Sequence, residues 1–246
     1  MIANALQLHA HGRDGRTVVG RIRAEGLCRA SRPFGEGAAA RVVVSQLGPG
    51  LVRGDTFASG GRIESGAHLI VAGQMATRIL SGPDTVTTAA EWDVAAGATL
   101  ELVAEPTLIC PGASYASRTE LRLEPGARAV VMEVVHRERG AALTIATVVT
   151  RRERLALHDV LRFEPEDADA GAIGTLAVFG ERADLAIVDA AADRCAAVRI
   201  GIDTLRDGDL LARVAGARVW DVREALNVLR LAAMSPLVED RRRTSA

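Results

Sequence analysis

The sequence predicts a mainly β protein in which short strands stack in layers, like the coils of a β-helix. A Gly-Ala pair followed by an apolar segment recurs four times, and the copies begin at Gly37, Gly66, Gly97 and Gly126. Successive glycines are 29, 31 and 29 residues apart. A constant period of this length is typical of stacked supersecondary units, which bury their apolar faces only against neighbouring units.

The composition of each copy indicates strands and not helices. Val, Ile and Leu dominate the segments that follow the four glycines, and glycine permits the positive φ that a tight turn requires. Chance recurrence of Gly-Ala in an Ala-rich chain is the alternative. The similar register of apolar residues after each glycine favours a true repeat.

The remaining elements follow from local patterns. Residues 15–30 predict an opening strand pair, and residues 143–150 and 155–163 predict another pair that continues the stack. Polar residues 164–171 predict a surface loop.

After Gly180 the pattern changes. A helix is expected over 184–198, a hairpin over 200–214, and an amphipathic helix over 219–234 that Pro236 ends. We therefore expect a layered β body (1–180) with a small C-terminal α/β cap of helix, hairpin and helix (181–246) packed on it in one integrated domain.

Composition excludes several classes of function. The chain has 246 residues, is 48% hydrophobic and 3% aromatic, and has a formal net charge of −1. This balance predicts neither nucleic-acid nor membrane binding. The three cysteines are widely spaced, and no signal peptide or membrane span is evident. We expect a cytoplasmic protein with free thiols.

Four carboxylates are candidates for chemistry, and each also has a simpler interpretation. Asp55 ends a Gly-rich bend, where it is expected to bind the amides of the turn. Glu105 follows an apolar strand and lies at an edge or in a lined cavity. Glu133 and Asp159 also follow apolar runs, and a solvated strand end is the simpler interpretation of both. Alternatively, stacking of the layers places the four carboxylates along one wall of a wet passage, where buried charges would need partners or water.

Other motifs point less clearly to a site. His9 and His11 have the spacing that puts both imidazoles on one strand face, but two ligands make a weak metal site. Cys110, beside a proline, is a soft metal ligand or core filler. The sequence shows no phosphate loop or dinucleotide fingerprint.

Several segments together resemble one known family. Residues 46–55, Gln-Leu-Gly-Pro-Gly-Leu-Val-Arg-Gly-Asp, resemble its Asn-Pro-x-Gly-Gly-Leu-Val-Gly-Gly-Asp stretch. Residues 73–81 resemble its Thr-Gln-x-Ala-Thr-Lys-Val-Tyr-Arg segment, and residues 105–113 its Glu-Pro-x-Ile-x-Phe-Pro-Gly-Ala block. The family is the urease accessory protein UreD, also called UreH. The chain departs from it at Arg53, where the family has glycine, and at Cys110, where it has phenylalanine. Arg78 replaces a lysine and keeps its charge.

The resemblance implies a non-enzymatic scaffold with a β-helix-like stack. It implies binding to the urease apoprotein and to UreF, which recruits the GTPase UreG, and delivery of nickel to urease through an internal tunnel. Asp55 and Glu105 fall on acidic positions of the matched blocks, whereas Glu133 and Asp159 depend on the layering argument alone. The four are the expected residues of a transient nickel route, with no tightly bound cofactor.

Two alternatives belong to other classes. A β-solenoid enzyme acting on carbohydrate would need paired carboxylates on an exposed groove with aromatic platforms, and aromatic residues are scarce here. A generic β interaction module would have no role with metal.

Overall fold

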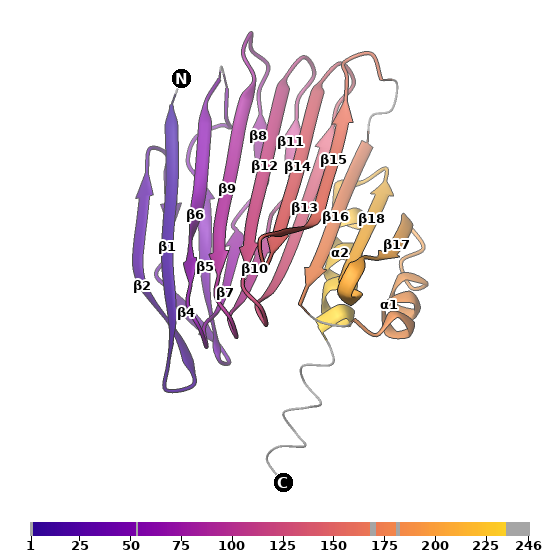
Figure 1. Cartoon of the computed structure of the whole chain (residues 1–246). Helices are drawn as coiled ribbons and strands as arrows, with labels where there is room; N and C mark the ends of the chain where they lie inside the picture. Colours follow the sequence, from indigo (N-terminus) through magenta and orange to yellow (C-terminus); the bar gives the residue numbers. More distant parts are fainter. Residues whose placement is uncertain (1, 53, 168–170, 181–182, 235–246) are drawn as a thin grey trace.

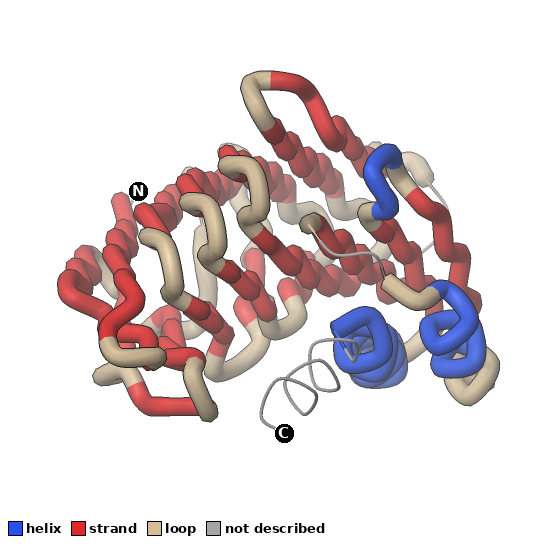
Figure 2. The backbone as a smooth tube through the Cα atoms, turned by 60° about the horizontal axis from the view of Figure 1, so that its bottom comes forward, coloured by secondary structure: helices blue, strands red, loops and turns tan. Residues whose placement is uncertain are grey.

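The computed structural model describes residues 2–52, 54–167, 171–180 and 183–234. Two β-sheets face each other, and the two described α-helices lie outside the two strand layers, on one side of the molecule (Figures 1 and 2). The expectation of a mainly β, layered architecture is confirmed.

Sheet A has seven strands, in the spatial order β15-β14-β12-β9-β6-β1-β2. In chain order they are β1 (Ala3–Arg13), β2 (Arg16–Glu25), β6 (Thr56–Ile63), β9 (Val86–Val94), β12 (Ser114–Leu123), β14 (Ala142–Arg151) and β15 (Arg154–Phe163). The five central strands, from β1 to β14, are parallel, whereas β2 and β15 pair antiparallel at the two edges.

Sheet B has eleven strands, of which eight form the order β17-β18-β16-β13-β10-β7-β5-β3. Its strands are β3 (Cys28–Ala30), β4 (Phe34–Glu36), β5 (Ala39–Gln46), β7 (His68–Gly73), β8 (Thr77–Ile79), β10 (Thr99–Val103), β11 (Thr107–Ile109), β13 (Arg128–Arg137), β16 (Gly171–Phe179), β17 (Arg199–Thr204) and β18 (Leu210–Gly216). Strands β5, β7, β10 and β13 are parallel. The chain thus passes repeatedly from sheet A to sheet B, one layer at a time.

The repeated glycines form turns, although not all four are the same kind of turn. Gly66, Gly97 and Gly126 have φ values of 74°, 71° and 79° and occupy the corners between the sheets. Gly37 (φ 65°) instead forms the hairpin between β4 and β5 within sheet B.

The register of the repeat holds for all four copies. Ala40, Leu69, Leu100 and Ala129, each three residues after its glycine, are neighbours across β5, β7, β10 and β13. Their side chains are buried in one core between the sheets.

The opening of the chain differs from the expected strand pair at 15–30. The pair is β1 with β2, so the first strand begins at Ala3. Polar His9 and His11 alternate with Leu6, Leu8 and Ala10, which fill the core. The alternating polar residues made this strand hard to recognise in the sequence, although it pairs on both sides, with β2 and β6.

The C-terminal segment joins sheet B directly. The expected hairpin is β17–β18, and β18 pairs with β16. Helix α1 (Leu185–Ala192) is shorter than expected, with Asp184 as its N-cap. Helix α2 (Val219–Met234) has the expected bounds. Part of the expected 164–171 loop, Pro236 and the charged tail lie outside the described residues.

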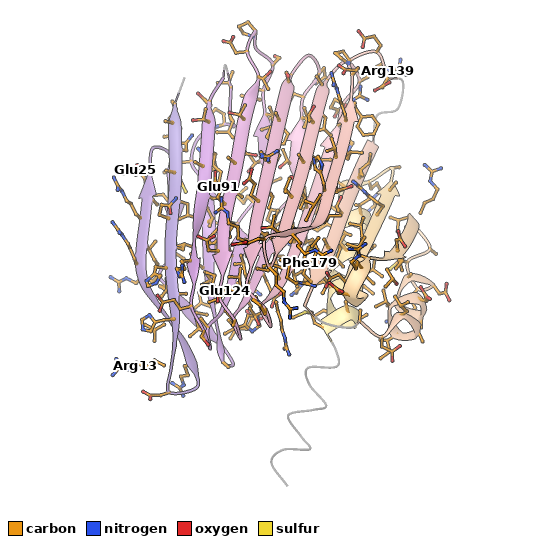
Figure 3. The ribbon with its side chains drawn as sticks, viewed as in Figure 1. Arg13, Glu25, Glu91, Glu124, Arg139 and Phe179 are labelled. Carbon is orange, nitrogen blue, oxygen red and sulfur yellow. The ribbon has the colours of Figure 1, made fainter. Side chains whose placement is uncertain are left out.

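Helix α2 packs on the outer face of sheet B, over β13, β16 and β18. Gly174 of β16 permits close approach, since a Cβ there would overlap Leu226 and lie 2.9 Å from Val222 Cγ1. The side chains in Figure 3 show the contrast between surface and core. Arg13 and Glu25 project outward from the edge of sheet A, whereas Phe179 is 1% exposed.

Candidate functional site

A cavity of about 230 Å³ lies between the two sheets. Its walls carry the inward-facing residues of the strands; most hydroxyl groups come from sheet A, whereas the two carboxylates come from the sheet B side. The polar and aromatic residues that line it include Gln46, Ser59, Thr77, Thr88, Trp92, Glu105, Thr107, Tyr115, Ser117, Thr119 and Glu133. The volume is ample for several water molecules beside polar partners.

The register of sheet A explains why hydroxyl groups gather here. Thr88 of β9 is the neighbour of Ser117 of β12, and Ala90 is the neighbour of Thr119. Thr119 in turn is the neighbour of Thr147 of β14. Side chains two apart on a strand share a face, so these positions form a polar band between the sheets.

Apolar clusters lie on either side of this band. One contains Leu69, Leu100 and Leu121, and the other contains Ile109, Leu143 and Ile145. The parallel layering therefore divides the interior into two apolar ends and a polar middle.

Glu133 of β13 brings a carboxylate into the polar middle. Its pKa is raised to about 7, chiefly by burial and to a smaller extent by the charge of Asp159, while the hydrogen bond with Ser117 and the charge of Arg213 act to lower it. Near pH 7 this carboxyl group is therefore present in both its neutral and its charged form. The interpretation of Glu133 as a solvated strand end is wrong, because the residue lies in the middle of β13 and lines the cavity.

Tyr115 lies beside Glu133 and remains neutral. Burial, and then the charge of Glu133, raise its pKa to about 12. Its Oη lies 2.8 Å from Thr88 Oγ1. The phenol is thus a hydrogen-bonding group of the wall and not a charged one.

Asp159 lies in the interior in the middle of β15, so a solvated strand end is again wrong. Nη2 of Arg213 on β18 donates to both its carboxylate oxygens, at 2.5 and 2.6 Å. Nη1 of the same guanidinium donates to Thr175 Oγ1 at 2.9 Å. This ion pair connects the two sheets at the level of Glu133.

Glu105 lies in the short connection between β10 and β11, on the sheet B side of the cavity. It forms an ion pair with Arg223 of α2. The expectation that a buried carboxylate here needs a partner is confirmed, and the partner comes from the C-terminal helix.

Asp55 binds one backbone amide of its own bend and one from the start of the described chain. It is 3% exposed and accepts hydrogen bonds from the amides of Ile2 (2.6 Å) and Val52 (3.0 Å). The expected interpretation of Asp55 as a turn-binding residue is confirmed. Arg53, the departure in the same bend, lies outside the described residues.

The four predicted carboxylates do not line one wall. Glu105 and Glu133 meet at the same cavity, and Asp159 is coupled electrostatically to Glu133. Asp159, however, comes from sheet A and Glu133 from sheet B, while Asp55 is not among the cavity residues. The single-wall arrangement is wrong because the chain passes between two facing sheets.

Sequence reasoning missed the arginines that neutralise these carboxylates. Arg213 and Arg223 come from the last third of the chain, far from their partners in sequence. A third such arginine, Arg230 of α2, pairs with Glu101 of β10, which is 3% exposed and also bonded to His68 Nε2 at 2.6 Å. An isolated charge in an apolar strand, as in residues 210–214, is a local signal for Arg213 alone.

The two histidines that the sequence singled out, His9 and His11, both lie in β1. The rings of His9 and His11 lie 6.3 Å apart between centroids, and His9 Nε2 lies 2.8 Å from Glu64 Oε1. Within the described ranges, no group of three or more His, Cys, Asp or Glu side chains is arranged to hold a metal ion.

Comparison with known proteins assigns the sequence to a family. A sequence model of the family described as "UreD urease accessory protein" matches residues 3–244. The chain belongs to the UreD family.

Several UreD family proteins are similar over most of the chain. The urease accessory protein UreD of Bacillus sp. (strain TB-90) is 26% identical over 231 residues, which cover 85% of each chain. That of Sorangium cellulosum (strain So ce56) is 27% identical, covering 83% of this chain and 72% of the relative. That of Actinomyces naeslundii is 30% identical, covering 72% of this chain and 69% of the relative. Among the described residues of this UreD family chain, no helix is long and apolar enough to cross a membrane.

Proposed function

We propose that this chain is a urease accessory scaffold that binds the urease apoprotein and UreF, and through UreF the GTPase UreG. In this complex it assists nickel insertion in the cytoplasm and catalyses no reaction of its own. The observation that carries the proposal is the family match over residues 3–244.

The interior supports a role in passing a divalent ion. The cavity presents hydroxyl groups and the carboxylates Glu105 and Glu133, which are hard oxygen ligands. Oxygen ligands hold a nickel ion less firmly than soft thiolates or imidazoles would. A wall of this kind suits an ion in transit.

The arrangement gives less support to a carbohydrate-active enzyme. Such an enzyme needs an exposed cleft with two carboxyl groups and aromatic platforms. Here Glu133 lies between two sheets, and Trp92 and Tyr115 are 1% and 6% exposed. Their faces are packed in the interior, where a sugar chain has no access.

Co-expression tests the proposal. Urease structural subunits, UreF and UreG are produced with and without this chain, and nickel per purified urease is measured together with activity. We expect urease with little nickel when the chain is omitted, and co-purification of the chain with UreF and urease when it is present. Full nickel loading without the chain would refute the proposal.

Two matched substitutions then test the route. Glu133→Gln removes the cavity carboxylate, and Glu64→Gln removes an exposed one that pairs with His9. We expect the first to lower nickel loading while complex formation persists, and the second to leave both unchanged. Equal loading by the two variants would exclude Glu133 from the route.

A further inference from the structure

The polar middle of the interior ends at a guanidinium group. Beyond Glu133, the register of sheet B runs from Glu133 of β13 to Thr175 of β16 and then to Arg213 of β18. Positions in register on adjacent strands share a face, so all three side chains point between the sheets. Arg213 reaches across to Asp159 of sheet A and back to Thr175.

The charges around this guanidinium favour a cation. Both carboxylate oxygens of Asp159 accept hydrogen bonds from Arg213. The charge of Arg213 lowers the pKa of Glu133, and the charge of Asp159 raises it. Thr147, which is 4% exposed, is the register neighbour of Asp159 and adds a hydroxyl oxygen nearby. Two carboxylates with hydroxyl groups are the ligand set that binds hard divalent cations.

We propose that Arg213 is a tethered counter-ion that takes the position of a divalent cation between Asp159 and Glu133. Without the guanidinium, these two carboxylates form a divalent-cation site. The positive charge that balances Asp159 and Glu133 is therefore the side chain of Arg213, and the wild-type chain does not retain a metal ion at this point. The inference rests on the proposed function only for the choice of Ni²⁺ as the probe.

Nickel binding to a variant without the Arg213 guanidinium tests this proposal. The full-length chain carrying Arg213→Gln is titrated with Ni²⁺ by calorimetry, and bound nickel is counted after equilibrium dialysis. We expect Arg213→Gln to bind one more Ni²⁺ per chain than the wild type. The affinity of the variant for this ion should be at least about tenfold higher than that of the wild type, because the affinity of an oxygen site for a cation rises with the number of charged ligands.

Matched variants identify the ligands. Adding Glu133→Gln or Asp159→Asn to Arg213→Gln should abolish the gain. Arg118→Gln removes an equal charge from an exposed pair with Glu120 and should produce no gain. Arg213→Lys keeps the positive charge and should exclude Ni²⁺ as the wild type does.

A stability readout covers the case in which Arg213→Gln folds poorly. Removing the guanidinium leaves Asp159 unpaired, so the variant should melt at a lower temperature. An ion that binds the folded state stabilises it. Ni²⁺ should therefore raise the melting temperature of Arg213→Gln and leave that of Arg118→Gln unchanged.

Three outcomes would overturn the inference: no gain in Ni²⁺ binding or melting temperature for Arg213→Gln, a gain that survives loss of Glu133 and Asp159, or an equal gain in Arg213→Lys. Failure here is distinguishable from failure of the proposed function. The latter is measured as nickel in urease, and this test measures binding to the chain itself.

Discussion

Arg230 of α2 offers a test of how the C-terminal helix is held on sheet B. Its Nη1 contacts Glu101 Oε2 at 2.5 Å, and the Glu101 side chain is 4% exposed. Arg230→Met removes the charge but keeps most of the apolar stem. The carboxylate then stays buried and keeps its hydrogen bond with His68 Nε2.

The variant should lose stability because the buried carboxylate of Glu101 keeps only part of its compensation. Breaking such a pair costs about 3 kcal/mol or somewhat more of unfolding free energy. For a chain of this size, that corresponds to a melting temperature lower by roughly 6–12 °C. Thermal and guanidinium unfolding followed by circular dichroism measure the change, and hydrogen exchange should show the loss centred on α2.

The pH dependence gives an independent check. Burial raises the pKa of Glu101, but the hydrogen bond with His68 and the charge of Arg230 together outweigh it, so the net pKa is lowered. A lowered pKa in the folded state stabilises the fold above the ordinary value near 4.5, and this contribution disappears as the pH falls through the folded-state pKa. The wild type and Arg230→Met should therefore converge in acid.

Two controls decide the interpretation. Arg118→Met breaks an exposed pair with Glu120 and should cost about 0–1 kcal/mol. Glu101→Met with Arg230→Met replaces both charges by apolar groups and should recover most of the loss. If Arg230→Met loses no more than Arg118→Met, or if the double variant is no better than the single one, the reasoning about this ion pair is refuted.

Two further predictions concern the interior and one loop. The pKa of Glu133 in the folded state, about 7, exceeds its ordinary value of 4.5, so the wild type should lose stability as the pH rises from 4.5 to 7. Glu133→Gln should remove this slope and be more stable at pH 8 by up to about 3 kcal/mol; an unchanged slope in denaturant titrations would contradict it. Arg137, 2% exposed, donates to the carbonyls of Ala141, Glu164 and Asp167. Arg137→Ala should destabilise the chain by about 1–3 kcal/mol and expose residues 164–167 to exchange, whereas unaltered exchange there would show that the loop holds without it.

Much of the architecture could be predicted from local patterns. The register of apolar residues after the repeated glycines correctly indicated strands stacked in layers, because the period of the chain equals one layer of the stack. The amphipathic pattern of 219–234 likewise predicted α2, since its buried Val222, Leu226 and Leu229 mark one helix face. A helix face or a strand alternation is a short-range property, so it can be read from adjacent residues.

Other local patterns were ambiguous. Gly37 has the same sequence signal as Gly66 but forms a hairpin, because Phe34–Glu36 returns as β4 beside β5. At the opposite ends of the strands, Gly112 and Gly140 also precede buried alanines and have φ values of 70° and 77°. Gly-Ala thus marks a tight turn, and the direction of the following strand depends on what it can pair with.

The candidate site depended on the tertiary structure. The sequence by itself identified Asp55, Glu105, Glu133 and Asp159 as candidates and established that buried ones need partners. It also predicted that Asp55 binds the amides of its turn, but it did not determine that Arg223 and Arg213 neutralise Glu105 and Asp159, which lie 118 and 54 residues away. The physical reason is that burial and Coulomb energy depend on distance in space, and two facing sheets bring together charges that no local pattern connects.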